Sequence, residues 1–308
     1  MDTIRHDPAA AITKAASRQT YYTIRLLADR ERVEDAYRAY GYFRWVDDIL
    51  DGEACSGRER RDFLERQKSL LERCYLGQGP GNRSAEENML VQLVRQDQER
   101  NSGLQAYLRN MMKVMEFDAL RRGRWITQLE LDEYTRHLAR AVTEAIHYFI
   151  GHDDFAPQDG TRYLAVSAAH ITHMLRDTFE DARLGYYNVP REVLQAGRIG
   201  PQDVQSAPYR AWVRERVRLA RRYFKDGKAY FARVRNLRCR VASCAYIARF
   251  EWLLDTLERE GCCLRPAYPE RKSPLTGLRM IELTVASLAW GGGSALPEGL
   301  SPARPEKL

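Results

Sequence analysis

Two aspartate pairs with the same spacing constrain this chain more than any other feature. Asp47 and Asp51 lie in the segment V-D-D-I-L-D, and Asp177 and Asp181 lie in the segment L-R-D-T-F-E-D. On a helix, residues four apart share one face and lie one turn from each other. Each pair therefore stacks two negative charges, which repel each other unless a cation lies between them. Two such pairs on facing helices would hold Mg²⁺, which prefers oxygen ligands and often shares them with substrate phosphates.

The surroundings of the two pairs argue against an ordinary solvated helix face. Each pair is embedded in apolar helical sequence and has an arginine nearby, Arg44 or Arg176. The first pair also continues a stripe of Tyr40, Arg44, Asp47 and Asp51 along one helical face. An aromatic ring, an arginine and two aspartates do not make a core stripe, so the pattern indicates the lining of a cavity.

The bulk properties of the chain are those of an ordinary globular protein. Its 308 residues suffice for one large domain, and a hydrophobic content of 44% allows a sizeable core. No apolar run approaches the length of a membrane span, and the polar first residues do not resemble a signal peptide. The six cysteines include no C-x-x-C pair, so reduced thiols are expected. We therefore expect a cytoplasmic protein without a transmembrane segment, whose contact with membranes, if any, is peripheral.

The charge of the chain narrows the choice of partners. A net charge of +7 suits either nucleic acid or a small polyanion. The arginines are interleaved with acids along helical segments, and no nucleic-acid-binding motif is present. A polyanionic small-molecule substrate explains the charge better, and we expect no nucleic-acid partner. No feature of the sequence indicates an oligomeric state.

Periodic segments along the chain predict helices throughout, with no run of alternating strands and no internal repeat. Residues 1–14 look unstructured, and the Gly- and Pro-rich tail 291–308 is expected to be disordered. We predict a single all-α domain over residues 1–290, a helical bundle around a central cavity. The expected helices are 15–27, 32–50, 59–75, 85–120 with a break at 101–103, 127–150, 161–185, a short helix within 191–208, 209–234, 241–260 and 275–290.

The two aspartate segments resemble the motifs of a known family. Residues 40–51, Y-G-Y-F-R-W-V-D-D-I-L-D, and residues 175–185, L-R-D-T-F-E-D-A-R-L-G, are similar to the first and second aspartate motifs of the squalene/phytoene synthases. The resemblance covers about residues 15–265. It implies the all-α isoprenoid synthase fold and Mg²⁺-dependent ionisation of an allylic prenyl diphosphate. It further implies that Asp47, Asp51, Asp177 and Asp181 hold the metal and that Arg44 and Arg176 contact phosphate oxygens.

Ionisation of an allylic diphosphate leaves a carbocation, which needs a water-poor pocket with aromatic walls. Candidates for such walls are Tyr21, Tyr40, Tyr42, Phe43 and Tyr134. For any one of them taken singly, core packing is the simpler interpretation.

The chain also departs from the family at positions that usually serve the diphosphates or the cavity wall. An arginine and a tyrosine that would hold a second diphosphate are replaced, while both aspartate pairs remain. The departures are His170 for a glutamine, His173 for an asparagine metal ligand, Tyr186 for an arginine, Asn188 for a tyrosine, Ser17 for a histidine, Phe250 for a tyrosine and Arg140 for a glycine.

These departures favour one prenyl diphosphate donor and a different acceptor. We predict a Mg²⁺-dependent prenyltransferase that transfers a prenyl group to a small, aromatic, carbazole-like acceptor, as some members of the family do. The alternative is a conventional squalene or phytoene synthase that condenses two prenyl diphosphates head to head. A third hypothesis is a non-catalytic binding or assembly factor, which the intact aspartates disfavour. Donor length, from C5 to C20, depends on which side chain closes the cavity floor.

The predicted substrate-binding residues are spread over several helices, and His173 is also predicted as a metal ligand. His170, His173 and Asp177 follow the spacing i, i+3, i+7, which would also allow zinc. The neighbouring acids suit Mg²⁺ better. The predicted substrate-binding residues are Ser17, Thr20, Tyr40, Tyr134, His170, His173, Tyr186 and Phe250.

Overall fold

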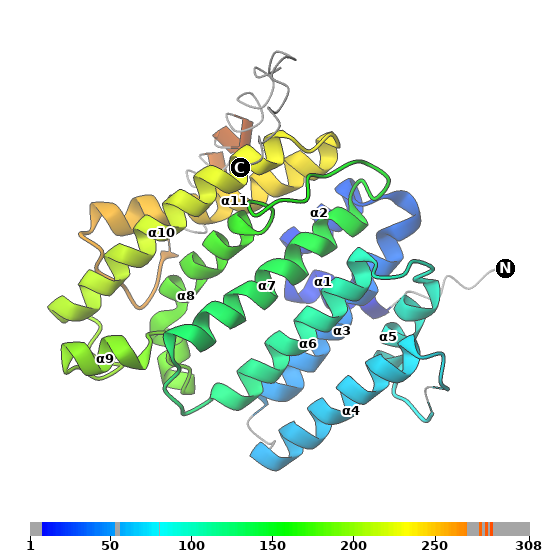
Figure 1. Ribbon diagram of the computed structural model, residues 1–308, viewed down its shortest axis with the longest axis horizontal. Helices are drawn as coiled ribbons and strands as arrows, with labels where there is room; N and C mark the ends of the chain where they lie inside the picture. Colours follow the sequence, from blue (N-terminus) through cyan, green and yellow to red (C-terminus); the bar gives the residue numbers. More distant parts are fainter. Residues whose placement is uncertain are drawn as a thin grey trace, which may run out of the picture.

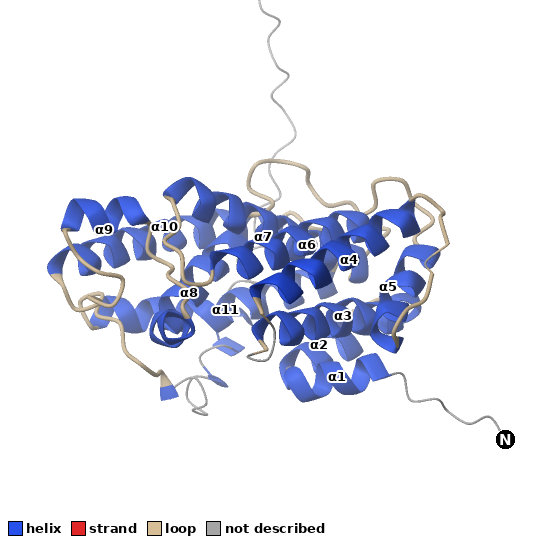
Figure 2. Cartoon of the chain, turned by 90° about the horizontal axis from the view of Figure 1, so that it is seen from below, coloured by secondary structure: helices blue, strands red, loops and turns tan. Residues whose placement is uncertain are grey.

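The structure, a computed structural model, describes residues 8–52, 56–79 and 81–269 and the short stretches 277–278, 281–282 and 284–285. The described residues are helical almost throughout and include no β-strand (Figures 1 and 2). A 3-10 helix, Arg30–Arg32, precedes α3. The α-helices are α1 (Pro8–Ala16), α2 (Arg18–Leu27), α3 (Val33–Asp51), α4 (Gly57–Tyr75), α5 (Ala85–Gln96), α6 (Gly103–Arg121), α7 (Gln128–Phe149), α8 (Leu164–Leu184), α9 (Arg191–Gly197), α10 (Ala207–Ala232) and α11 (Leu237–Arg259).

Five of these helices close a ring around the interior. Helix α3 packs on α6, α6 packs on α7, and α7 contacts α11. Helix α11 also packs on α2, which returns to α3. Helices α8 and α10 pack on each other and extend the array beyond α7, as Figure 1 shows. The ring leaves α2, α3, α6, α7 and α11 with one face each toward a shared interior.

Local signals in the sequence set the helix ends. Thr127 and Glu130 form the predicted capping box at the start of α7. Helix α8 ends because Gly185 adopts a left-handed conformation with φ of 87°, which glycine adopts without steric cost. The amide of Tyr186 then donates to the carbonyl of Asp181 at 2.8 Å. This reversal directs the chain after α8 back along the second aspartate motif.

A glycine allows α10 to pack closely against α8. A Cβ atom added at Gly227 of α10 would lie 2.6 Å from the Cβ of Ala165 on α8. No side chain larger than hydrogen fits there, so α8 and α10 approach each other closely. Beside this contact, Phe224 and Tyr230 of α10 are fully buried. The tight packing makes α8 a firm support for the second aspartate pair.

The expectation that residues 1–14 are unstructured was wrong for residues 8–14, because α1 begins at Pro8; residues 1–7 lie outside the described part of the chain. Ala9 and Thr13 are fully buried, and a Cβ at Gly41 of α3 would lie 3.3 Å from the Cα of Ala9. The short alanine-rich segment is helical because α3 offers it a flat docking site. The predicted helix 15–27 is divided at Ser17, which caps α2.

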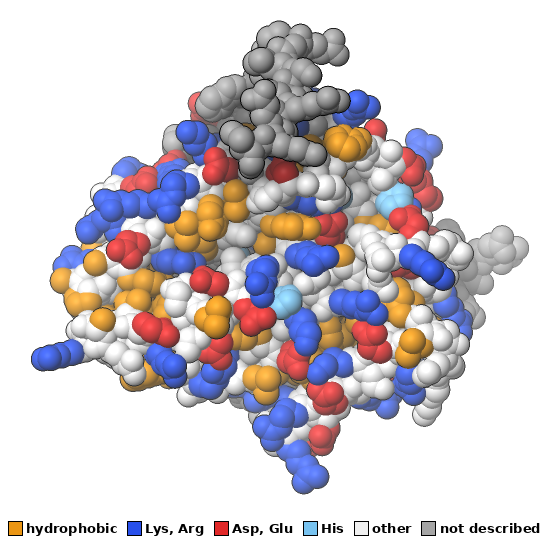
Figure 3. Space-filling model, viewed as in Figure 1, with side chains coloured by type: hydrophobic (Ala, Val, Ile, Leu, Met, Phe, Trp, Pro, Cys, Tyr) orange, Lys and Arg blue, Asp and Glu red, His pale blue; other side chains and the backbone are white. Residues whose placement is uncertain are grey.

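Several other predictions can be compared with the described part of the chain. The break at residues 101–103 is confirmed, because α5 ends at Gln96 and α6 begins at Gly103. Most of the predicted helix 275–290, and all of the tail 291–308, lie outside the described residues. No described helix is both long and apolar enough to cross a membrane. On the face in Figure 3, basic and acidic side chains are interspersed rather than gathered into one patch.

Candidate active site

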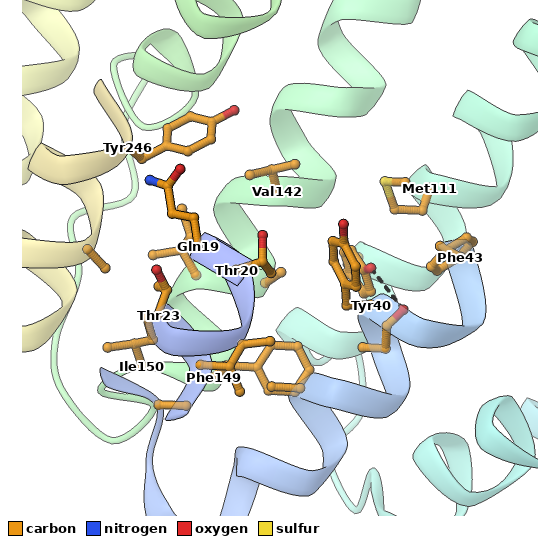
Figure 4. A pocket seen from close by; sticks show the side chains of 18 of the residues that line it. Gln19, Thr20, Thr23, Tyr40, Phe43, Met111, Val142, Phe149, Ile150 and Tyr246 are labelled. Atoms are coloured by element: carbon orange, nitrogen blue, oxygen red, sulfur yellow. Dashed lines mark hydrogen bonds between the residues drawn. The ribbon is translucent and has the colours of Figure 1, made fainter. Parts of the chain in front are cut away.

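A cavity of about 450 Å³ lies inside the ring of helices. Its walls are mostly apolar and come from α2, α3, α6, α7 and α11. Figure 4 shows Phe149 and Ile150 at the end of α7, and Gln19 of α2 beside Tyr246 of α11. The residues that line it along α7 are Leu138, Val142, Ala145, Ile146 and Phe149. A volume of this size is typical of a pocket for a small organic ligand.

The cavity has a polar end and an apolar end. Along α3 its lining runs from Ala36 to Asp47, a rise of about 16 Å for eleven residues of helix. The start of α3 lies near the end of α7, because the amide of Asp29 donates to the carbonyl of Phe149 at 2.8 Å. Phe149 therefore closes the apolar end, and Asp47 and Arg44 line the opposite, polar end.

A chain of polar side chains connects the two aspartate motifs at the polar end. Tyr186 donates from its hydroxyl to Asp51 at 3.2 Å. The guanidinium of Arg121 lies 4.9 Å from the centre of the Tyr186 ring and donates to Asn188 at 2.7 Å. Asn188 in turn donates to Asp181 at 2.6 Å. The first motif on α3 and the second on α8 thus lie on two sides of one site.

A further acid and arginine belong to this network, although neither is among the predicted site residues. Asp118 of α6 accepts hydrogen bonds from Arg121 at 2.7 Å and from Tyr134 at 2.8 Å. Burial raises the pKa of Asp118, and Arg121 opposes that rise. The sequence signal for the pair is weak, since it consists only of an acid three residues before an arginine on one helix.

Electrostatics differ sharply among the four motif aspartates. Burial, followed by the charge of Asp51, raises the pKa of Asp47 to about 6. Burial also raises the pKa of Asp181 to about 6, although Asn188 and Arg121 partly oppose it. These two acids therefore carry negative charge that nearby cations do not fully balance.

Asp177 shows the opposite behaviour. Both of its oxygens accept hydrogen bonds from Arg176 at 2.6 Å, and His173 lies 2.9 Å away. Although burial acts in the other direction, Arg176 and His173 hold the pKa of Asp177 well below its ordinary value. Asp177 is therefore ionised at neutral pH and already has cationic partners.

The donor set suits a hard divalent cation, since carboxylate oxygens from two helices face one site. The described residues nevertheless contain no preformed group of three His, Cys, Asp or Glu side chains that could hold a metal ion. The aspartates would have to turn from their present partners, such as Tyr186 and Arg176, to coordinate Mg²⁺. Zinc fits less well, because His170 packs edge-on against Tyr134 with ring centres 4.8 Å apart while His173 is exposed and bonds to Asp177.

Of the other predicted substrate-binding residues, some line the cavity and the rest lie next to residues of the site. Thr20 and Tyr40 line the cavity, and Ser17 accepts hydrogen bonds from the amide and the hydroxyl of Thr20 at 3.2 and 2.9 Å. Phe250 is buried beside the polar end, with its ring centre 6.3 Å from that of His173.

Some predicted positions lie away from the cavity. Of the aromatic candidates, Tyr40 and Phe43 line it, but Tyr42 points to the opposite side of α3 and donates to Gln67 at 3.1 Å. Tyr42 is therefore no cavity wall, and the simpler interpretation of core packing holds for it, because a buried phenol needs a hydrogen-bond partner and Gln67 supplies one. Arg140 was expected in the cavity wall but is exposed on α7.

Comparisons with known proteins agree with this geometry. The model of the squalene/phytoene synthase family matches residues 13–276. A presqualene diphosphate synthase from Zymomonas mobilis is 28% identical over 201 residues. The match covers 65% of this chain and 65% of that synthase, so this chain spans slightly less than two thirds of the synthase. The crystal structure of squalene synthase HpnC from Alicyclobacillus acidocaldarius is similar with a TM-score of 0.65 and 17% identity, over 84% of this chain and 95% of that one. A dehydrosqualene synthase solved with a ligand gives a TM-score of 0.67 and 14% identity, over 93% and 96% of the two chains. The predicted isoprenoid synthase fold is confirmed.

Proposed function

Because this chain belongs to the squalene/phytoene synthase family, we propose that it condenses two allylic prenyl diphosphates head to head in a Mg²⁺-dependent reaction. Membership makes it a transferase that uses prenyl diphosphates. Its relatives are named for the synthesis of presqualene diphosphate, squalene and dehydrosqualene. Transfer to a carbazole-like acceptor, the function first predicted, finds no support among them. The head-to-head alternative is therefore the better-supported reaction.

The observation that carries the proposal is an apolar cavity whose polar end meets both aspartate motifs. Asp47 and Arg44 line that end of the cavity. A hydrogen bond joins Asp51 to Tyr186, whose ring contacts Arg121, and hydrogen bonds through Asn188 lead from Arg121 to Asp181. A prenyl diphosphate has the same two parts, a long apolar chain and a polyanionic head. The cavity would take the chain, and the charged end would take the diphosphate.

Each group at the polar end then has a role in breaking the allylic C–O bond. The metal would be held by Asp47, Asp51, Asp177 and Asp181, with His173 beside them, and when bound it would stabilise charge on the departing oxygen. Arg44 and Arg176 would orient the diphosphate, because a planar guanidinium matches two phosphate oxygens at once. Tyr40 and Phe43 present aromatic rings to the cavity, where they would face the allylic cation and exclude water.

A product assay tests this proposal directly. The purified full-length protein is incubated with Mg²⁺ and C10, C15 or C20 prenyl diphosphate, with and without carbazole, and the products are separated by liquid chromatography and mass spectrometry. We expect a head-to-head product from prenyl diphosphate alone. Asp177→Asn should abolish it, whereas Glu180→Gln should not, because Glu180 is exposed on the same helix.

Two results would contradict the proposal. Turnover that occurs only when carbazole is present would restore the aromatic-acceptor hypothesis. If the prenyl diphosphate stays unconverted, or gives only the free alcohol, the protein does not join two prenyl groups.

A further inference from the structure

Arg249 lines the cavity wall and pairs with no acidic side chain among the residues that the structure describes. It lies on α11, three residues after Tyr246, and both side chains line the cavity (Figure 4 labels Tyr246). Its guanidinium carbon lies 5.7 Å from the centre of the neighbouring Phe250 ring. Within the ranges that the structure describes, Arg249 forms no hydrogen bond and no ion pair. Its positive charge therefore has no directly paired carboxylate in the described part of the chain.

The two arginines of the aspartate motifs themselves differ from Arg249 in this respect. Arg44 pairs with Asp47 at 3.4 Å and also with Asp48. Arg176 binds both oxygens of Asp177. Their charges are largely balanced by aspartates, so a new anion would have to compete for them.

The surroundings of Arg249 place it near both aspartate-bearing helices. Its charge interacts with Arg176 and Asp177 on α8 and with Tyr40 on α3. Burial lowers the pKa of Arg249, which means that the cavity wall removes part of its hydration. An incompletely hydrated cation without a directly paired counter-ion destabilises the ligand-free protein. An anion bound beside it would remove that destabilisation.

We propose that Arg249 binds a diphosphate group of the prenyl substrates from the α11 side of the cavity. This inference rests on the proposed function, because it takes the ligand to be a prenyl diphosphate. It also accounts for a departure in the sequence, since Tyr186 stands after Gly185 where the family resemblance leads one to expect an arginine. In this chain α11 supplies a guanidinium that the loop after α8 lacks, and its planar fork suits phosphate oxygens.

Binding measurements without turnover test the role of Arg249. Isothermal titration calorimetry in the presence of Mg²⁺ compares wild type, Arg249→Gln, Arg249→Lys and the control Arg218→Gln, which removes an exposed arginine on α10. The titrants are inorganic diphosphate, an unreactive thio analogue of C15 prenyl diphosphate, and the C15 alcohol, which lacks the diphosphate.

The glutamine variant should bind inorganic diphosphate and the thio analogue roughly 10- to 100-fold more weakly, the range for one charge-assisted hydrogen bond. Its affinity for the C15 alcohol should not change. Arg249→Lys should lose less affinity, because it keeps the charge without the fork, and Arg218→Gln should bind like the wild type.

Equal diphosphate affinity in wild type and Arg249→Gln would overturn the inference. An equal loss of affinity for the C15 alcohol would also overturn it, because that result indicates damage to the cavity wall rather than loss of an anion-binding group. A wild-type protein that binds the analogue through Arg249 but forms no head-to-head product would refute the proposed function and leave this inference intact.

Discussion

Replacing Asp181 with asparagine should stabilise the ligand-free protein while abolishing its activity. Asp181 is mostly buried at the polar end of the cavity, and burial raises its pKa from an ordinary 3.8 to about 6. A pKa shift of that size means that folding disfavours the ionised form of Asp181 by about 3 kcal/mol. The carboxylate therefore destabilises the folded, ligand-free protein at neutral pH. Asparagine removes the charge and keeps an oxygen that can accept the hydrogen bond from Asn188.

The sign of the pH dependence follows from linkage. The pKa of Asp181 is higher in the folded state than in the unfolded state, so the folded state binds the proton more tightly. The wild type therefore loses stability as the pH rises from about 4 to about 6, and the loss is complete above that window. The gain in the free energy of unfolding that Asp181→Asn brings should be absent near pH 4 and should reach about 3 kcal/mol above pH 7. For a chain of 308 residues, each kcal/mol raises the melting temperature by roughly 1.5 °C.

Thermal unfolding followed by circular dichroism, from pH 4.5 to pH 8 in EDTA, measures the effect. Glu180→Gln is the matched control, because it removes an exposed carboxylate from the same helix. Parallel melting curves for Asp181→Asn and wild type across this pH range would refute the reasoning. An equal gain in Glu180→Gln would also refute it, since the gain would then reflect net charge rather than burial of Asp181.

Three further predictions concern activity. Asp47→Ala and Asp177→Ala should each abolish turnover with an unchanged far-ultraviolet circular dichroism spectrum, and EDTA should inactivate the wild type; full activity in EDTA would contradict Mg²⁺ dependence. Arg44→Lys and Arg176→Lys should each lower kcat roughly 10²-fold, because lysine lacks the planar fork; unchanged steady-state kinetics in both would remove them from the site. Phe149→Ala should open the apolar end of the cavity and raise the ratio of kcat/KM for C20 diphosphate to that for C15 diphosphate at least about tenfold, since each extra buried carbon contributes up to about 0.8 kcal/mol. An unchanged ratio in competition assays would show that Phe149 does not close the cavity.

The helices and the aspartate motifs could be predicted because both depend on local spacing. The capping box at Thr127 and the left-handed Gly185 mark helix ends through contacts within a few residues. Helix α1 escaped prediction because its stability comes from docking on Gly41, which is distant in the sequence. Asp118 and Arg121 escaped it for the same reason, since they join the site only where α6 meets the chain after α8.

By itself, the sequence determined that the chain is helical, that it carries two aspartate pairs suited to Mg²⁺ and that it resembles the squalene/phytoene synthases. Only the tertiary structure decided that Tyr40 faces the cavity while Tyr42 turns to Gln67. It also decided that Arg249, which no sequence motif singled out, lies in the cavity wall without an acidic partner among the described residues. The reason is physical: spacing along a helix tells which residues share a face, but the neighbours that this face meets are set by packing between segments far apart in the chain.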